Sequence, residues 1–282
     1  MSPDRHAHMH DAAGRTPGQG RPGRSPKRSV RESRPKRDAH IETSENRTGA
    51  QPMNFSKGPQ GHILKRFDKD MRKLQKRVLK MGGMVVEQME RLQDALGQED
   101  EEQARQVIEG DRPIDLQEVK ADKFIVNLLA RRSPVGSDLR YIVAASRIVT
   151  ELERLGDETA QVARVLFQER YSLGGCEGGT ADEEIRRLLG QLIGLLEKAL
   201  DAFEDYDYQG ALALARSDDS PRAELDKRLK HLMEWVFENQ QQVAEAVNFV
   251  LVLRALERSV RHVQNIAEHT IYLITGEDIR HR

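Results

Sequence analysis

Two pairs of acidic residues have a spacing that would bring their side chains together on a helix. Glu118 and Asp122 are four residues apart, and so are Glu153 and Asp157. Residues separated by four lie on one face of a helix, so each pair offers two carboxylates to one point. Neighbouring carboxylates repel one another unless a cation lies between them. Two such helices side by side would supply oxygen ligands for a hard cation such as iron, manganese or magnesium.

No other residue pattern points to an enzyme. The chain has 46 acidic residues, so roughly seven pairs with this spacing are expected by chance, and spacing alone is a weak signal. The sequence has no HExxH motif and no glutamate followed by histidine three residues later, the pattern of di-iron carboxylate proteins. Its one cysteine, Cys176, has no disulfide partner and no flanking cation that would favour the thiolate. We therefore expect a protein without catalytic activity.

A long helix is predicted from Leu64 onward. Apolar residues recur there at alternating steps of three and four, the spacing of a helix with one apolar seam. The seam consists of Leu64, Phe67, Met71, Leu74, Val78, Met81 and Val85. Gly82 and Gly83 lie within this run, and each costs roughly 1 kcal/mol relative to alanine in a helix. We expect them to permit a close helix approach or a bend.

The acid pairs fall on two later helices. Gly110 is expected to end a short helix over 101–109, and Asp111 and Pro113 to begin the next, because proline is tolerated in the first turn. This second helix is predicted to end near Arg132. It carries the first acid pair.

A turn with the sequence SPVG is predicted at 133–136. Ser137 is the expected N-cap of the following helix, which runs to about Tyr171 and carries the second acid pair. Within this helix the small residue Gly156 would let a neighbouring element approach the face that carries Glu153 and Asp157.

Composition changes at the chain's beginning and near its middle. Residues 1–60 hold twelve Lys and Arg against six Asp and Glu, and they show no apolar period. Such a segment is expected to be disordered. The glycine-rich sequence YSLGGCEGG is a candidate boundary, and Thr180 and Glu183 after it have the spacing of a capping box. The predicted organisation is a basic tail over 1–58, a helical bundle over 59–172, a linker over 173–181 and a second helical bundle over 182–282.

No membrane span is predicted, because the longest apolar stretch, 247–253, is far shorter than the roughly 20 residues that a spanning helix needs. Together with the lone cysteine, this favours a cytoplasmic protein. The tail lacks aromatic residues between its arginines, so specific nucleic-acid binding is not expected.

One helical element is used twice in the sequence. Asp94-Ala95-Leu96 matches Asp201-Ala202-Phe203, and both are followed by alanine ten residues after the aspartate; the offset is 107. Leu152-Glu153-Arg154 matches Leu256-Glu257-Arg258 at an offset of 104, which requires three fewer residues in the second copy. These matches predict an all-α protein built from two copies of a unit of about one hundred residues.

The sequence resembles the PhoU family of phosphate-signalling regulators. The resemblance is carried by MGGMVVEQM at 81–89, VIEGDRPIDLQEVKAD at 107–122, RRSPVGSDLR at 131–140 and ELERLGD at 151–157. QNIAEH at 264–269 and GEDIRH at 276–281 support it in the second half.

The resemblance implies two tandem antiparallel three-helix bundles in one all-α chain. It also implies a cytoplasmic negative regulator of phosphate uptake and phosphate-starvation signalling, without enzyme activity. Such a regulator links the ATPase of the phosphate ABC transporter to a sensor histidine kinase. A homodimer is expected, and contact with the membrane only through these partners.

Some members of this family bind multinuclear metal clusters through E/D-x-x-x-D motifs, two per repeat, and this resemblance implies a metal site in the first repeat. The matching residues are Glu118, Asp122, Glu153 and Asp157, and the expected metal is iron, manganese, zinc or magnesium. The second repeat departs from the motif, because Glu257 is followed four residues later by Arg261 instead of an acid. We expect this arginine to pair with Glu257 and to replace the metal there.

Several other residues leave alternatives open. Arg140 is interpreted as an anion- or partner-binding residue or as the partner of a nearby carboxylate. His262 and His269 are interpreted as packing or surface residues, and Trp235 as a core residue or a contact between bundles. A helical adaptor with changed partners and a metal-storage or redox protein stay open as functions.

Overall fold

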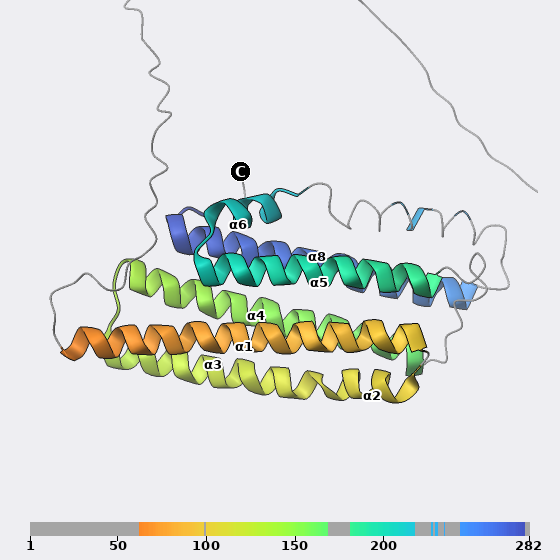
Figure 1. Cartoon of the computed structure of the whole chain (residues 1–282), viewed down its shortest axis with the longest axis horizontal. Coiled ribbons are helices and arrows are strands. Elements are labelled where there is room, and N and C mark those ends of the chain that lie inside the picture. The colour runs from red at the N-terminus through yellow and green to blue at the C-terminus, as the bar shows by residue number, and fades with distance from the viewer. Residues whose placement is uncertain are drawn as a thin grey trace, which may run out of the picture. The chain divides into compact units, whose positions relative to one another are not determined.

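The computed structural model describes residues 62–98, 100–168, 181–217 and 243–279, with residues 227, 229, 230 and 234. Within these residues all regular structure is helical, which confirms the predicted all-α fold (Figure 1). The predicted tail, Cys176, Trp235 and all but the last residue of the predicted linker lie outside the described residues. The elements are α1 (His62–Gln98), α2 (Glu101–Glu109), α3 (Asp111–Arg132), α4 (Ser137–Ala163) with a π-helical turn at Arg164–Gln168, α5 (Ala181–Asp205), α6 (Tyr208–Ala215) and α8 (Val243–Thr275).

The long helices form two groups that share one core. In the first repeat α1, α3 and α4 pack against one another, with α2 joining α1 to α3; in the second repeat the described helices α5, α6 and α8 pack together (Figure 1). The groups meet where α1 contacts α5 and where α4 contacts α8. The apolar seam predicted for α1 faces this core: Met71, Leu74, Val78, Met81 and Val85 are all buried. None of the described helices is long and apolar enough to cross a membrane.

The two repeats use the same turn after their first helix. The backbone N–H of Asp100 donates to Ala95 at 3.0 Å, and that of Asp207 donates to Ala202 at 2.9 Å. Each aspartate then caps the short helix that follows, with its side chain accepting from backbone N–H groups of the first turn. Since these aspartates are 107 residues apart, the structure repeats the offset found in the sequence.

Helix α4 begins as predicted at residue 137, but Ser137 is not its cap. The N-cap is Gly136, with φ +58° and ψ −126°, and no side chain bonds the free amides. Glycine adopts this backbone conformation without the steric cost that other residues meet, so the chain turns at Gly136 and serine becomes the first helical residue. The predicted role of Ser137 was therefore wrong.

Polar contacts join the first repeat to α8. The Glu158 carboxylate accepts from Nε and an Nη of Arg258 at 2.5 and 2.7 Å. The buried Glu151 is bonded to Nδ1 of His262 at 2.7 Å and accepts from Asn265 at 3.1 Å. His262 therefore serves packing between the repeats.

Arg140 makes another link between the repeats. Its Nε donates to the backbone carbonyl of Leu273 at 3.0 Å, in the last turn of α8. A guanidinium is a favourable partner for the free carbonyls at a helix C-terminus. Among the described residues, the partner of Arg140 is thus a backbone carbonyl group and not a carboxylate.

Candidate metal centre

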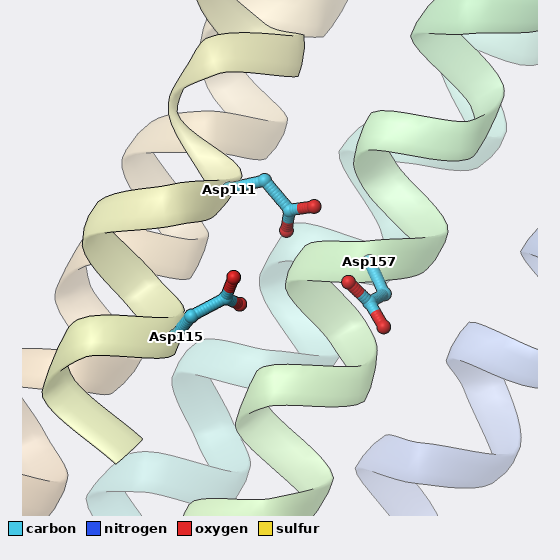
Figure 2. Close-up of side chains that lie close together, drawn as sticks. All are labelled: Asp111, Asp115 and Asp157. Carbon is cyan, nitrogen blue, oxygen red and sulfur yellow. The ribbon is translucent and has the colours of Figure 1, made fainter. Parts of the chain in front are cut away.

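Three carboxylates from two helices converge in the first repeat. Asp111 is the first residue of α3, Asp115 lies one turn later, and Asp157 lies on α4 (Figure 2). Each offers an oxygen atom, and these three atoms all lie within 4.8 Å of one another. Asp111 is half-buried, and the other two are exposed.

A glycine on α4 lets the first turn of α3 come this close. A Cβ atom added at Gly156 would lie 3.2 Å from Cδ1 of Ile114 and 3.5 Å from Oδ1 of Asp111. Ile114 is buried in the core, so a side chain at position 156 would push against a residue with little freedom to move. Gly156 therefore permits the close approach that the sequence predicted, and it fixes Asp111 beside Asp157.

Asp111 is the most enclosed member of this cluster. Its Oδ1 atom is buried and has no hydrogen-bond partner, while Oδ2 lies 3.5 Å from an Nη of Arg164. Burial, and then the charges of Asp157 and Asp115, raise the pKa of Asp111 to about 6. A buried carboxylate oxygen without a donor is unfavourable, and a bound cation would satisfy it.

The acidic character extends along both helices beyond this cluster. Burial, and then the charges of Asp157 and Glu118, raise the pKa of Glu153 to about 7. Burial, followed by the charge of Asp122, also raises the pKa of Glu118. Repulsion of this kind is relieved by protons or by a cation, so the face between α3 and α4 favours positive ligands.

Of the four residues predicted as ligands, the structure places Asp157 in the three-carboxylate cluster. Glu118 and Glu153 lie close enough to influence its electrostatics, and Asp122 is exposed on α3. Metal binding by these residues stays a prediction. Asp111 and Asp115 were not predicted as ligands, although they too are four residues apart.

The matching face of the second repeat carries a different charge pattern. Glu257 is paired with Arg254 of α8, with Nη1 and Oε2 at 2.5 Å. The predicted partner, Arg261, is exposed one turn further along, and its pairing with Glu257 stays a prediction. Asp218, which the repeat matches to Asp111, lies outside the described residues.

The donor set of the first repeat fits a hard cation. Carboxylate oxygens are the ligands that magnesium, manganese and iron favour, and no sulfur or imidazole ligand belongs to the cluster. Asp111, Asp115 and Asp157 would form the centre of such a site. Glu153 and Glu118 are near enough to respond to its charge.

Comparison with known proteins gives a consistent result along the helical chain. The model of the PhoU domain matches twice, at residues 78–166 and 185–270. These matches begin 107 residues apart and end 104 residues apart, which are the two offsets of the internal repeat.

Two relatives are named for the phosphate-specific transport system. The accessory protein PhoU homolog of Pseudomonas aeruginosa is 36% identical over 223 residues, covering 78% of this chain and 90% of that protein. The accessory protein PhoU of Escherichia coli K12 is 30% identical over 220 residues, covering 78% of this chain and 90% of that protein.

Solved structures share the fold. The crystal structure of PhoU from Pseudomonas aeruginosa has a TM-score of 0.69 and 35% identity, covering 75% of this chain and all of that one. The phosphate transport system regulatory protein PhoU from Streptococcus pneumoniae has a TM-score of 0.66 at 24% identity, covering 76% of this chain and 99% of that one. With the domain model matched in both repeats, this chain belongs to the PhoU family.

Proposed function

We propose that this protein is a negative regulator of phosphate uptake and of the phosphate-starvation response. In this role it is a cytoplasmic adaptor between the ATPase of a phosphate ABC transporter and a sensor histidine kinase. It reaches the membrane only through these partners and works as a homodimer.

The observation that carries this proposal is the match of the PhoU domain in both repeats, together with relatives named as accessory proteins of phosphate-specific transport. Fold alone does not determine function. Here, however, the identity of 36% extends over 90% of one such relative, so the likeness includes surfaces as well as the core.

We further propose that the first repeat binds a divalent or trivalent cation: iron, manganese, zinc or magnesium. Asp111, Asp115 and Asp157 would hold it, with the predicted ligands Glu118, Asp122 and Glu153 on the same two helices. The support is the unpartnered buried Oδ1 of Asp111 and the mutual approach of three carboxylates. A bound cation would neutralise their repulsion and fix the start of α3 against α4.

Deletion of the gene tests the regulatory proposal. Alkaline phosphatase activity during growth with abundant phosphate should become constitutive, and a plasmid copy of the full chain should restore repression. Unchanged low phosphatase activity in the deletion strain would contradict negative regulation. Co-purification tests the adaptor role. The protein should co-purify with the tagged transporter ATPase and with the tagged sensor kinase, and each experiment is done in cells with and without the second partner.

A further inference from the structure

The solvent side of α3 carries a second apolar seam. Leu116, Val119 and Val126 are 50%, 45% and 64% exposed. With exposed Lys123 and Ala130 they follow steps of three, four, three and four. This is the spacing of residues that face a partner helix in a coiled coil. We call the five positions 116, 119, 123, 126 and 130 the outer seam.

The outer seam is separate from the face that α3 already buries. Another side of α3 packs into the core of the first repeat. Its buried residues are Ile114, Ala121, Ile125 and Leu128. A surface helix needs one apolar stripe to join its domain, with polar residues on the opposite side. The second stripe on α3 is therefore not required by the fold of this repeat.

Charged residues flank the outer seam in a fixed order. Asp115 and Asp122 lie on the side of the outer seam toward α4, and Lys120 lies on its opposite side. These are the positions that flank the apolar seam of a coiled-coil helix. Among the described residues, neither Lys120, Lys123 nor Asp122 takes part in an ion pair. These charges are available to specify a partner's orientation.

We propose that the outer seam of α3 is the docking surface for an amphipathic helix of a partner protein. The partner helix carries its own apolar seam, an acidic residue opposite Lys123, and a basic residue on the flank that faces Asp122. Such a helix buries the exposed apolar side chains and places opposite charges against Lys123 and Asp122. This inference rests on the proposed function, because an adaptor acts through helices or surfaces of this kind.

A second copy of this chain is a poorer match for the same surface. Parallel pairing of two α3 helices would place Lys123 against its own counterpart in the seam. Antiparallel pairing would set the flank with Asp122 against the same acidic flank of the other copy. Like charges placed together disfavour both arrangements.

A designed peptide provides the first test. The probe is a fluorescein-labelled helical peptide of three heptads, with leucine in its seam, glutamate opposite Lys123 and arginine on the flank facing Asp122. Fluorescence anisotropy with the full chain should show saturable binding. The variant Val119→Asp with Val126→Asp should bind at least tenfold more weakly, since two charges would enter the apolar contact. Equal affinity of this variant would overturn the proposal.

Matched variants separate docking from loss of folding. Leu251→Asp alters an equally exposed apolar residue on α8 (45% exposed) and should leave peptide affinity unchanged. Asp122→Lys should weaken the arginine-flanked peptide, and a peptide with glutamate on that flank should recover the affinity. Failure of this charge exchange would overturn the predicted orientation. A fall in molecular mass by light scattering for Val126→Asp would assign the seam to a second copy and overturn the partner proposal.

Phosphatase assays then connect the surface to regulation. In the deletion strain, the double variant Val119→Asp with Val126→Asp should accumulate normally yet fail to restore repression, while Leu251→Asp restores it. Full repression by the double variant would overturn the seam as the regulatory surface and leave the proposed function intact. A deletion strain without any phenotype would instead contradict the proposed function. In that case the peptide experiment would be the test of docking at the outer seam.

Discussion

The acidic face between α3 and α4 in the first repeat and the face of α8 around Glu257 in the second repeat show how one fold supports two charge patterns. On α4, Glu153 is followed after four residues by Asp157, which joins Asp111 and Asp115 within 4.8 Å. On α8, Glu257 is followed by Arg261 and is already paired with Arg254. One face gathers more carboxylates than the arginine beside Asp111 can neutralise, and the other pairs its glutamate with Arg254.

The core beneath these faces has changed much less. Buried residues on α1 recur as buried residues on α5 at the offset of 107: Val78, Met81, Val85, Met89, Leu92 and Ala95 match Ile185, Leu188, Leu192, Leu196, Ala199 and Ala202. Packing therefore constrains the helix seams of both repeats equally. The surface charges are free of that constraint, so the two faces have diverged while the fold stayed the same.

The largest expected difference between the faces is metal content. Asp111→Asn with Asp157→Asn should reduce bound iron, manganese or zinc at least tenfold in protein purified without chelator, measured by elemental analysis, because two of three converging carboxylates lose their charge. Glu257→Gln is the matched change on the second face and should leave metal content unaltered. Metal that persists in the first variant but disappears in the second would reverse the assignment.

The acid face should also respond to pH, since its carboxyl groups protonate near neutrality. The pKa is about 6 for Asp111 and about 7 for Glu153, above the values near 4 of unfolded chains. In the metal-free protein the native state therefore binds more protons than the unfolded state between about pH 4 and pH 7, so the free energy of unfolding falls as pH rises through that window. Metal affinity should rise by roughly tenfold or more over its upper part, because ligands must be deprotonated.

Calorimetric titration with manganese and urea unfolding at several pH values measure both trends. Glu153→Gln should make the unfolding free energy less dependent on pH, and Glu257→Gln should not. A metal-free protein that becomes more stable as pH rises from about 5 to about 7 would show that burial and the neighbouring carboxylates do not raise the pKa of these groups.

Two contacts between α4 and α8 should contribute differently to the free energy of unfolding, because one is more buried than the other. His262→Ala would leave the buried Glu151 without its bond at 2.7 Å, and we expect a loss of about 2 kcal/mol in unfolding free energy. Arg258→Gln would remove the more exposed contact with Glu158 and should cost only about 1 kcal/mol. Urea denaturation measures both losses. Equal losses would mean that burial does not set the strength of these contacts.

The smallest expected difference in stability is at a glycine position that the two repeats share. Gly83 and Gly190 match at the offset of 107, but a Cβ at Gly83 would meet nothing within 4 Å, whereas one at Gly190 would lie 2.7 Å from Nε2 of Gln93. Gly83→Ala should stabilise the protein by about 1 kcal/mol, since alanine favours the helix. Gly190→Ala should gain less, because it displaces the bond from Gln93 to the Arg186 carbonyl at 2.8 Å. Equal gains in thermal unfolding would refute this difference.

The helices were predictable because each is specified locally. Steps of three and four marked the buried side of α1, and Gly110 and Pro113 located the junction of α2 and α3. Gly82 was expected to allow either a close approach or a bend. A Cβ there would lie 2.5 Å from Cδ2 of Leu200, so its role is a close approach of α1 to α5.

The site was less predictable because spacing within one helix does not reveal which turn faces the next helix. Asp111 was interpreted only as a helix start, yet its place beside Asp157 depends on Gly156, which lies 45 positions later. The partner of Arg140 is a backbone carbonyl 133 residues away, and no residue type in the sequence marks it. Contacts to the backbone and between distant turns require the structure.

The pairing of α4 with α8 has a consequence for synthesis on the ribosome. Leu152 and Leu155 of α4 are buried, and α4 packs against α8, which is synthesised later. At bacterial translation rates, the 79 residues between these helices take on the order of 10 s to emerge. During that interval the side of α4 that α8 will cover has no partner from its own chain. All helices of the first repeat are therefore made before the side of α4 that contacts α8 is covered, and that side is covered only when α8 leaves the exit tunnel.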